Sequence, residues 1–459
     1  MPPEKSAYAL ARYSRSPDSI RQSLEWVRTH DEKAFLESYY FQYGHASIAD
    51  LGHAIFCFEG VSELAAIEIE DEPLWDGQAK SSRYQDFSKA GVVTPPEIAG
   101  SPAEPAYQQA AGNLLDAYHQ LHQRAFDFLA ERTPRPDTMK PEPYRRALHA
   151  RAYDVARYLL FLGIPTNLGQ VASIRTLEKQ MRRLGASCYA EVRELAGEMA
   201  QACAKPPECV WDPATATEPL APTLARHADP DLYSQQSRSN VAAWAAANLA
   251  AFTPEAQTAS VDLVRPTDPL HEIVATLLYA VTPRPFRDLY DDVSAWSPAR
   301  QREVLDVAVQ GRPRRDELLR EFRSGYGFVF DIVTDIGAYR DLHRHRRAIQ
   351  IRQPYTTALG YETPALVTAA GLEDFYRQTL QSAPVTTPYL LPFATRLRCL
   401  FKMDFAEAEY IARVRSGVKG HFSYRQIAWL MKERLAEAIP DLGRLVEATP
   451  PWVEDPLER

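Results

Sequence analysis

A segment rich in proline, alanine and threonine, "AKPPECVWDPATATEPLAPTLARHADPD" at residues 204–231, interrupts the hydrophobic periodicity of the chain. Such a composition is typical of a connection, because proline breaks helices and strands alike. The chain has 459 residues, 45% of them hydrophobic, and a single core stops growing at roughly 250–300 residues. We therefore predict two domains, residues 1–203 and 232–459, joined by a linker at 204–231.

Apolar spacing predicts both helices and strands. One long amphipathic helix, with an irregularity expected at Gly185, is predicted from residues spaced by three or four positions: Leu177, Met181, Leu184, Cys188, Val192, Leu195 and Met199. A second is predicted from Ile427, Leu430, Met431, Leu435 and Ile439, with Pro440 ending it. The short runs "AIFCFEGV" and "GFVFDIVTDI" are expected to be strands that lead into helices.

Both halves show a similar order of pieces, in which a strand-like run precedes a polar loop, a proline-containing stretch and a helix. This repetition favours a divergent internal duplication. The predicted fold class is α+β, with helices packed on a small mixed or antiparallel sheet in each half.

Charge and composition exclude several classes of protein. The formal net charge of -8 argues against a nucleic-acid or anionic-membrane binder, since both require a basic surface. No apolar run approaches the roughly 20 residues that span a bilayer, and the first residues lack a signal-peptide pattern. Neither nucleotide-binding glycine motifs, a GxSxG serine elbow nor metal-ligand spacings occur. We expect a soluble, cytoplasmic protein without a metal site.

An unusually basic run, "AYRDLHRHRR", stands out in this acidic chain. If the run is helical, Arg340, Arg344 and Arg347 share one face, which could hold an anion. The alternative is a solvated helix end whose arginines pair with Asp335 and Asp341.

A second candidate anion site is the loop "SSRY" in the first half. Ser81 and Arg83 place a hydroxyl and a guanidinium two residues apart, as in phosphate-binding loops. An ordinary polar turn is the alternative.

The segment from Gly44 to Tyr84 resembles the flavin-dependent thymidylate synthases, whose signature runs GHxS, then G[IV]S, then RHRxxSxNxxSxRY. Its matching positions are His45, Ser47, Gly60, Val61, Ser62, Ser81, Arg83 and Tyr84. Its arginine triplet is replaced by Asp71, Glu72 and Pro73, with Asp76 and Gln78 at the first Ser and the Asn. The second half resembles the same family in the complementary way. There "RDLHRHR" supplies Arg344, His345 and Arg346, while Pro354, Thr356 and Thr357 occupy the Ser, Arg and Tyr positions.

The resemblance continues in "ARYLLFLGIPTNLGQVASIR", where Arg157 matches the nucleotide-binding arginine of an ARxxLP element. Ser173 and Arg175 match the flavin-binding NxR element, with Ser173 in place of Asn. The corresponding second-half positions are Pro388, Asp404 and Ala406. Arg415 matches the uracil-contacting arginine of the family, and Arg183 is its gapped first-half counterpart.

The resemblance implies one composite site, because family active sites draw residues from different subunits and each half lacks what the other keeps. Arg344, His345, Arg346 and Arg415 of the second half are expected to face Ser81, Arg83 and Arg157 of the first. The implied substrate-binding residues are Ser81, Arg83, Tyr84 and Arg157. The implied cofactor-binding residues are Arg344, His345, Arg346, Arg175 and Ser173. The implied catalytic residues are Arg415, which activates the pyrimidine, and Arg183 second.

The implied reaction is reductive methylation of dUMP to dTMP, with FAD as cofactor and with methylenetetrahydrofolate and NADPH as co-substrates. By the same analogy, two chains form a homodimer with four family domains. One alternative is a non-catalytic flavin- or nucleotide-binding protein of the same fold, acting on another uridylate or on none. A plainer alternative is an α+β scaffold whose arginines serve only salt bridges.

Overall fold

The computed structural model describes residues 1–30, 46–209, 217–255, 258–314, 316–382, 385–455 and 457–458. The first half contains α1 (Pro3–Tyr13), α2 (Ile20–Thr29), η2 (Ala46–Leu51), β1 (His53–Ser62), α4 (Glu63–Glu70), β2 (Asp76–Ala79), α5 (Glu104–Arg132), α6 (Pro141–Ala156), η3 (Arg157–Leu159), β3 (Pro165–Ser173), α7 (Ile174–Gly185) and α8 (Ala190–Cys203). The short helix α9 (Pro222–Ala225) follows.

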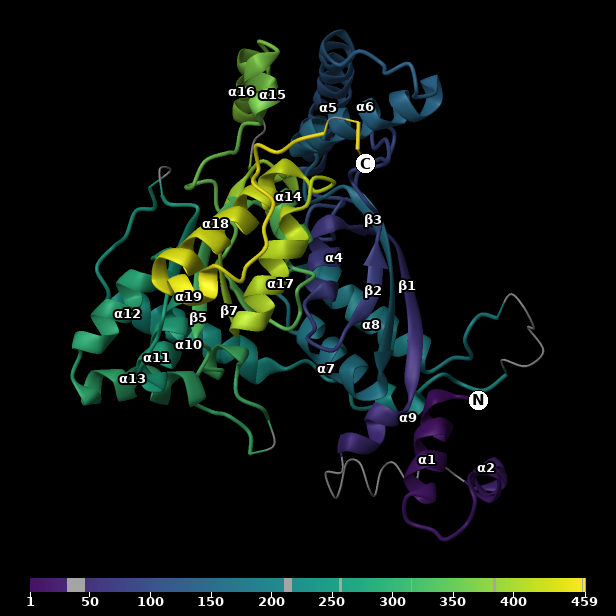
Figure 1. Ribbon diagram of the computed structural model, residues 1–459. Coiled ribbons are helices and arrows are strands. Elements are labelled where there is room, and N and C mark those ends of the chain that lie inside the picture. Colours follow the sequence, from purple (N-terminus) through teal and green to yellow (C-terminus); the bar gives the residue numbers. More distant parts are fainter. Residues whose placement is uncertain are drawn as a thin grey trace.

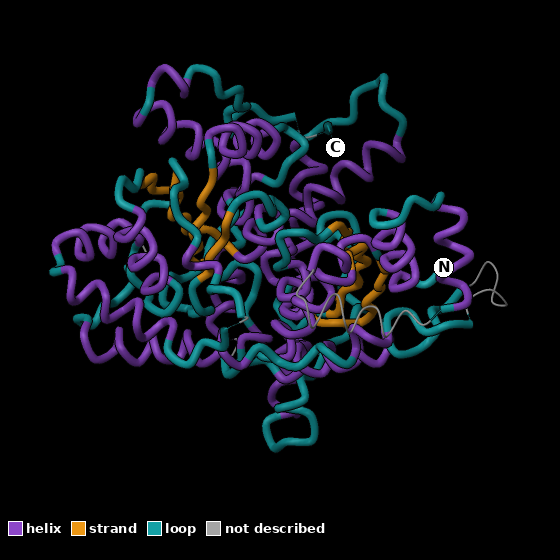
Figure 2. The backbone as a smooth tube through the Cα atoms, turned by 90° about the horizontal axis from the view of Figure 1, so that it is seen from below, coloured by secondary structure: helices purple, strands orange, loops and turns teal. Residues whose placement is uncertain are grey.

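The second half contains α10 (Leu232–Asn248), β4 (Val261–Val264), α11 (Pro269–Tyr279), α12 (Phe286–Ala295), α13 (Pro298–Val309), η4 (Arg320–Phe322), β5 (Phe328–Asp335), α14 (Ile336–Leu342), β6 (Ile349–Arg352), α15 (Ala365–Ala369), α16 (Glu373–Ser382), η5 (Pro388–Leu390), β7 (Arg396–Met403), α17 (Phe405–Ser416), α18 (Phe422–Ala438) and α19 (Pro440–Gly443). The predicted α+β class is confirmed. Figure 2 shows the strands of the two halves as two separate groups surrounded by helices.

Each half has its own antiparallel sheet, with strand order β1-β3-β2 in the first and β4-β5-β7-β6 in the second. The two sheets are built alike. In each, a long strand runs into a capped helix: Ser62 caps α4 and Asp335 caps α14. The partner strand does the same, with Ser173 capping α7 and Asp404 capping α17. Both predicted strands are therefore present, and each leads into a helix as expected (Figure 1).

The two halves meet through reciprocal backbone hydrogen bonds. The Leu162 nitrogen donates to the Leu391 carbonyl at 3.1 Å, and the Phe393 nitrogen donates to the Leu160 carbonyl at 2.6 Å. The same sequence separation relates Leu160 to Leu391 and Leu162 to Phe393, so the contact maps onto itself when the halves are exchanged. This is the geometry of a pseudo-twofold axis.

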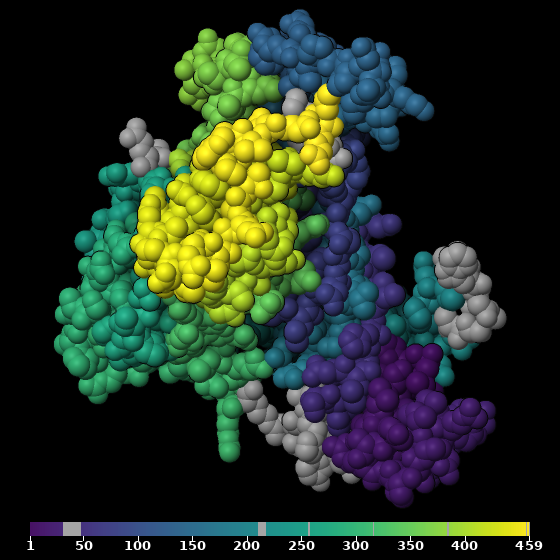
Figure 3. Space-filling model, viewed as in Figure 1, coloured from purple at the N-terminus to yellow at the C-terminus, as the bar shows by residue number. Residues whose placement is uncertain are grey.

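The main hydrophobic core is shared by both halves. Phe161 and Phe393, both fully buried, belong to the same apolar cluster. A second cluster, beneath α10, α11 and α13, belongs to the second half alone. Figure 3 shows the second half, in green and yellow, packed directly against the first. Among the described residues, no helix combines the length and apolarity needed to cross a bilayer.

The helix predicted over 177–199 is not continuous, and it breaks at Gly185, where the sequence indicated an irregularity. The structure has two helices there, α7 and α8, separated by a turn at 186–189. At Gly185 an added Cβ would lie 3.2 Å from Pro230, and the Ser187 hydroxyl accepts a hydrogen bond from the Tyr189 nitrogen, which closes the turn. The apolar spacing continues because both helices face one core. The predicted second-half helix is confirmed as α18, which ends two residues before Pro440.

The predicted linker is packed against the first half where it is described. The Leu220 nitrogen donates to the Lys205 carbonyl, and the buried Glu4 carboxylate accepts from the nitrogens of Thr223 and Leu224 at 2.9 and 3.0 Å. The chain therefore returns along the first half before α10 begins.

A glycine beside the pseudo-twofold axis gives a test of this contact. A Cβ at Gly163 would lie 2.5 Å from the Tyr107 hydroxyl and 3.0 Å from the Tyr389 carbonyl. We expect Gly163→Ala to lower the free energy of unfolding by about 1–3 kcal/mol, because the packed contact cannot admit a methyl group. Denaturant unfolding measures this loss. The matched control is Gly197→Ala in α8, where nothing lies within 4 Å, and there the change should stabilise by up to about 1 kcal/mol. Equal effects at both positions would contradict the tight contact.

Candidate functional site

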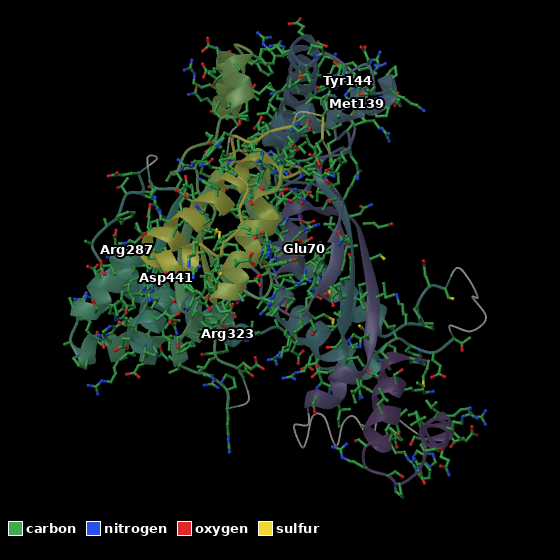
Figure 4. All side chains as sticks on the ribbon, viewed as in Figure 1. Glu70, Met139, Tyr144, Arg287, Arg323 and Asp441 are labelled. Carbon is green, nitrogen blue, oxygen red and sulfur yellow. The ribbon has the colours of Figure 1, made fainter. Side chains whose placement is uncertain are left out.

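A cavity of about 250 Å³ lies between the two halves, and we call it the first cleft. Its walls are α4, the loop after β2 and η3 from the first half, and α14 with the turn after it from the second half. The charged residues that line it are Lys80, Arg83, Arg157, Arg340 and Arg344, against Glu63, Glu70 and Asp341. Glu70 is labelled in Figure 4 and lies where the halves meet, near the centre of the molecule. The excess of cations makes the cleft suited to an anion.

Arg83 is fixed by bonds to both halves. Its guanidinium donates to both carboxylate oxygens of Asp154, at 2.8 and 3.2 Å, and to the Tyr424 hydroxyl and the Lys419 carbonyl of the second half, each at 3.1 Å. Burial opposes its charge, but Asp154 outweighs this and raises the Arg83 pKa. The Ser81 hydroxyl accepts from the Arg83 nitrogen, so the loop is held in one shape before any ligand arrives.

Arg157 is the least satisfied cation of the first cleft. Its side chain is 1% exposed, and one terminal nitrogen donates to Asp341 of the second half at 3.2 Å. Its Nε and its other terminal nitrogen have no hydrogen-bond partner among the described residues. A buried charged donor without a partner costs free energy. These two nitrogens therefore fit an anionic ligand.

Arg340 links the first cleft across the halves. It donates to the Ser82 hydroxyl at 3.2 Å and forms an ion pair of 2.8 Å with the buried Glu63. Burial raises the pKa of Glu63 to about 7, against the opposing effect of Arg340. Glu63 therefore changes charge near neutral pH.

Arg344 is the exposed cation among the residues that line the first cleft. The condition that residues 338–347 are helical is not met, because α14 ends at Leu342 and Arg344 lies in the turn that follows. The structure gives the Arg344 side chain no hydrogen bond or ion pair with a described residue. Arg347, predicted on the same face, instead points to Glu407 at 3.7 Å. Arg344 and Arg83 line the same cavity, as the resemblance requires.

His345 and Arg415 form a pair next to the first cleft. The Arg415 Nε donates to His345 Nε2 at 2.7 Å, while His345 Nδ1 lies 3.5 Å from Glu407. The Arg415 donation keeps Nε2 as an acceptor, and burial, followed by the charge of Arg415, lowers the His345 pKa despite Glu407. The Arg415 and Arg83 guanidinium groups lie 5.6 and 5.8 Å from the centre of the same Tyr424 ring. The Tyr424 ring therefore contacts both Arg415 and Arg83, and Arg83 lines the first cleft.

The remaining predicted site residues divide into two groups. Tyr84 lines the first cleft and is 56% exposed. Six predicted residues do not line it: His345, Arg346, Arg415, Ser173, Arg175 and Arg183. Arg346 lines a neighbouring cavity, 3.2 Å from Asp76 and 5.1 Å from the centre of the Trp75 ring.

Ser173 and Arg175 lie at the far end of β3. The Ser173 hydroxyl caps α7, and Arg175 pairs with Asp50 at 3.1 Å. Arg183 lies in a different cavity and donates to Glu72 at 2.8 Å. Gly44 and His45 of the GHxS element lie outside the described residues. Among the residues that the structure describes, no cluster of His, Cys, Asp and Glu could hold a metal ion.

Sequence reasoning missed Asp154 and Glu63. A signal existed for each. Asp154 precedes Arg157 by three residues at the end of α6, and Glu63 directly follows the serine that ends β1 and caps α4. Neither position marks a partner by itself, because the arginines that they contact are Arg83 and, in the other half, Arg340.

Titration of Glu63 gives a prediction about stability. Its folded-state pKa is raised to about 7 from 4.5, so the native state binds more protons between these values and stability falls as pH rises through this window. We expect a loss of about 2 kcal/mol between pH 5.5 and 7.5, measured by denaturant unfolding at these two pH values. Glu63→Gln should remove most of this slope, whereas Glu59→Gln, on the exposed side of β1, should keep it. If the free energy of unfolding of Glu63→Gln changes with pH as much as that of the wild type, another group causes the pH dependence.

The fold and the first cleft define a class: an α+β protein of two similar halves with a cationic cleft between them. Residues 1–206 match the family described as thymidylate synthase complementing protein. This match confirms, for residues 1–206, the resemblance to the flavin-dependent thymidylate synthases seen in the sequence.

Two relatives extend over both halves. A UPF0159 protein of Chlamydia muridarum is 26% identical over 442 residues, which cover 88% of this chain and 81% of the relative. A UPF0159 protein of Thermoplasma acidophilum is 23% identical and covers 95% of this chain and 94% of its own.

Solved structures similar to part of the chain include thymidylate synthase X of Helicobacter pylori with FAD and dUMP. It is 17% identical, with a TM-score of 0.29, over 43% of this chain and 88% of its own. Another is a UMP/dUMP methylase of Streptomyces cacaoi with 5-bromo-dUMP, 14% identical, with a TM-score of 0.31, over 49% of this chain and 89% of its own.

Proposed function

We propose that the chain is a FAD-dependent thymidylate synthase-like enzyme, which binds dUMP in the first cleft and methylates it reductively to dTMP. Methylenetetrahydrofolate and NADPH are the co-substrates in this proposal. The observation that carries it is Arg157, a buried guanidinium with two nitrogens that have no hydrogen-bond partner among the described residues, in a cationic cavity beside the Ser81–Arg83 loop. The match of residues 1–206 to the thymidylate synthase complementing protein family supports the reaction class.

The residues of the first cleft fit a phosphate-bearing ligand. A cavity of about 250 Å³ is close to the lower end of the roughly 300–1,000 Å³ range of ligand pockets, which suits one mononucleotide. Arg157 and Arg344 have donors to spare, so we assign them direct contacts with phosphate oxygens. The Arg83 guanidinium already donates hydrogen bonds to Asp154, Tyr424 and Lys419. In this proposal Arg83 therefore fixes the 81–84 loop and does not bind the phosphate.

Arg415 is the proposed catalytic residue. Its charge beside the pyrimidine favours loss of the N3 proton, and His345 fixes its orientation through the 2.7 Å bond. Arg344, His345 and Arg346 would hold FAD, which when bound supplies redox chemistry that no side chain provides. Arg183 is not assigned a catalytic role in this proposal, because its guanidinium donates to Glu72 and to the Glu68 carbonyl.

We further propose that the chain is a divergent tandem duplication, with domains at 1–203 and 232–459, and that two chains form a homodimer. The similar capped strands and the reciprocal contact at Leu162 and Phe393 support the duplication. On the first-half sheet, Ile55 and Val171 are adjacent and 70% and 42% exposed, which supports a partner there. Light scattering of the purified chain tests the homodimer, because it measures the mass of the assembly in solution.

The experiment that tests the function is anaerobic incubation of the flavin-loaded protein with dUMP, methylenetetrahydrofolate and NADPH, with dTMP detected by mass. Formation of dTMP and bleaching of the flavin by NADPH support the enzyme. A protein that binds dUMP without turnover is the non-catalytic alternative. Replacing dUMP with UMP tests whether another uridylate is the substrate. If Arg344→Ala binds both dUMP and FAD as tightly as the wild type, the remaining alternative is an α+β scaffold whose arginines serve only salt bridges.

A further inference from the structure

A second cleft lies where exchange of the two halves would place the first. It has a volume of about 450 Å³, and its walls include α4 from the first half and α14, β6 and the residues after β6 from the second. Ser81 comes two residues after the end of β2 in the first cleft, and Pro354 comes two residues after the end of β6 in the second. The two clefts therefore have the same construction with different side chains.

The charges of the two clefts differ in balance. The residues lining the first cleft include five cations and three carboxylates. The charged residues lining the second are Arg183, Arg238, Arg320 and Arg352, against Glu68, Asp71, Asp231 and Glu321. Four cations thus face four carboxylates, so the second cleft has no excess charge to attract an anion.

The arginines of the second cleft are paired with carboxylates of the same chain. Arg320 is 2.6 Å from Asp71, and Arg352 is 3.0 Å from Glu68. Arg183 donates to Glu72 at 2.8 Å, outside the lining itself. Burial opposes the charge of Asp71, but Arg320 and then Arg183 and His343 overcome it and lower the Asp71 pKa. Asp71 is therefore ionised and surrounded by cationic groups, as a bound phosphate would be.

Asp71 occupies the position in the second cleft that Arg344 occupies in the first. Ser62 caps α4 and Asp335 caps α14, and Asp71 and Arg344 each follow their cap by nine residues. One site therefore presents an unpaired guanidinium and the other presents a carboxylate. The substitution reverses the charge at equivalent places of the pseudo-twofold arrangement.

We propose that Asp71, with Glu68, is an internal anion that fills a second oxyanion site built from Arg183, Arg320 and Arg352, so that this site opens to phosphate only when the carboxylate is removed. The inference goes beyond the proposed function, since it concerns a different cleft, whose ligand would be an inorganic or esterified phosphate. It also gives the acidic residues a role in stability, because they neutralise arginines that would otherwise repel one another.

The test is Asp71→Asn combined with Arg344→Ala, compared with Arg344→Ala alone, so that phosphate binding in the first cleft is weakened and is the same in both chains. In a chloride buffer, Asp71→Asn should lower the midpoint of thermal unfolding, because Arg320 loses its partner. Saturating inorganic phosphate should raise the midpoint of the double variant by on the order of 5 °C more than that of Arg344→Ala alone. Calorimetry should show one additional phosphate site.

The matched control is Asp50→Asn in the same background, which removes a carboxylate from the partly exposed pair with Arg175. Phosphate should have no added effect there, and sodium chloride of equal ionic strength should not replace it. If the Asp71→Asn chain is unfolded in chloride, recovery of its helical circular dichroism on adding phosphate supports the proposal. Equal responses to phosphate with and without Asp71→Asn, or no recovery, would overturn it, whether or not the first cleft binds dUMP.

Discussion

Arg344→Ala is expected to weaken dUMP binding by about 10- to 100-fold while leaving the midpoint of thermal unfolding unchanged. A hydrogen bond to a charged group contributes about 1.5–3 kcal/mol, and each 1.4 kcal/mol is a factor of about ten. Arg344 is exposed and the structure gives it no protein partner among the described residues, so its truncation removes ligand contacts only. Calorimetric titration with dUMP and a thermal melt measure the two quantities.

The matched control for this prediction is Arg347→Ala. Arg347 is three residues further along, its side chain is 74% exposed, and it points to Glu407 rather than into the first cleft. We expect its dUMP affinity to stay within about twofold of the wild type, because an exposed ion pair contributes little. Equal losses in both variants would mean that only the general positive potential matters. An unchanged affinity in Arg344→Ala would remove Arg344 from the site.

Asp154→Ala is expected to lower the free energy of unfolding by about 3–5 kcal/mol, the usual result of removing one partner from a buried ion pair. Asp154 and Arg83 are 2% and 10% exposed in their side chains, and two hydrogen bonds join them. The change leaves the Arg83 charge buried and releases the 81–84 loop. Denaturant unfolding with an unchanged m-value would measure the loss as stability.

The control for the buried pair is Asp76→Ala. Asp76 also pairs with an arginine of the chain, Arg346, at 3.2 Å, but its side chain is 90% exposed. Its removal should cost less than about 1 kcal/mol. A loss in Asp154→Ala no larger than that in Asp76→Ala would show that water reaches the Arg83 pair and that the loop is not fixed by it.

The two clefts explain how one chain can carry arginines at equivalent places without equivalent sites. In the first, Arg157 is buried and two of its nitrogens have no hydrogen-bond partner in the part of the chain that the structure describes. In the second, Arg320 and Arg352 bond to carboxylates of α4 and of the residue after it. An anion gains free energy only where the protein has not already supplied one, so a single cleft per chain suits a nucleotide.

Local spacing in the sequence was enough for the strand ends, the α18 helix and the α+β class, because hydrophobic periodicity and helix-capping residues act within a few positions. It indicated an irregularity at Gly185 but not the separation into two helices, and it did not indicate the end of α14 at Leu342. In both places the apolar or charged pattern continues past the turn. Contacts with distant segments, such as Pro230 against Gly185, decide where the backbone bends.

For the site, the sequence shows which groups are present: a hydroxyl and a guanidinium at Ser81 and Arg83, and a basic run around Arg344. Tertiary contacts determine which of these groups remain available to a ligand. Arg83 is bonded to Asp154 and Arg183 to Glu72, whereas two nitrogens of Arg157 have no hydrogen-bond partner among the described residues. A charged group can bind a ligand only where protein groups have not already paired with it, and the pairing groups lie far away in the sequence.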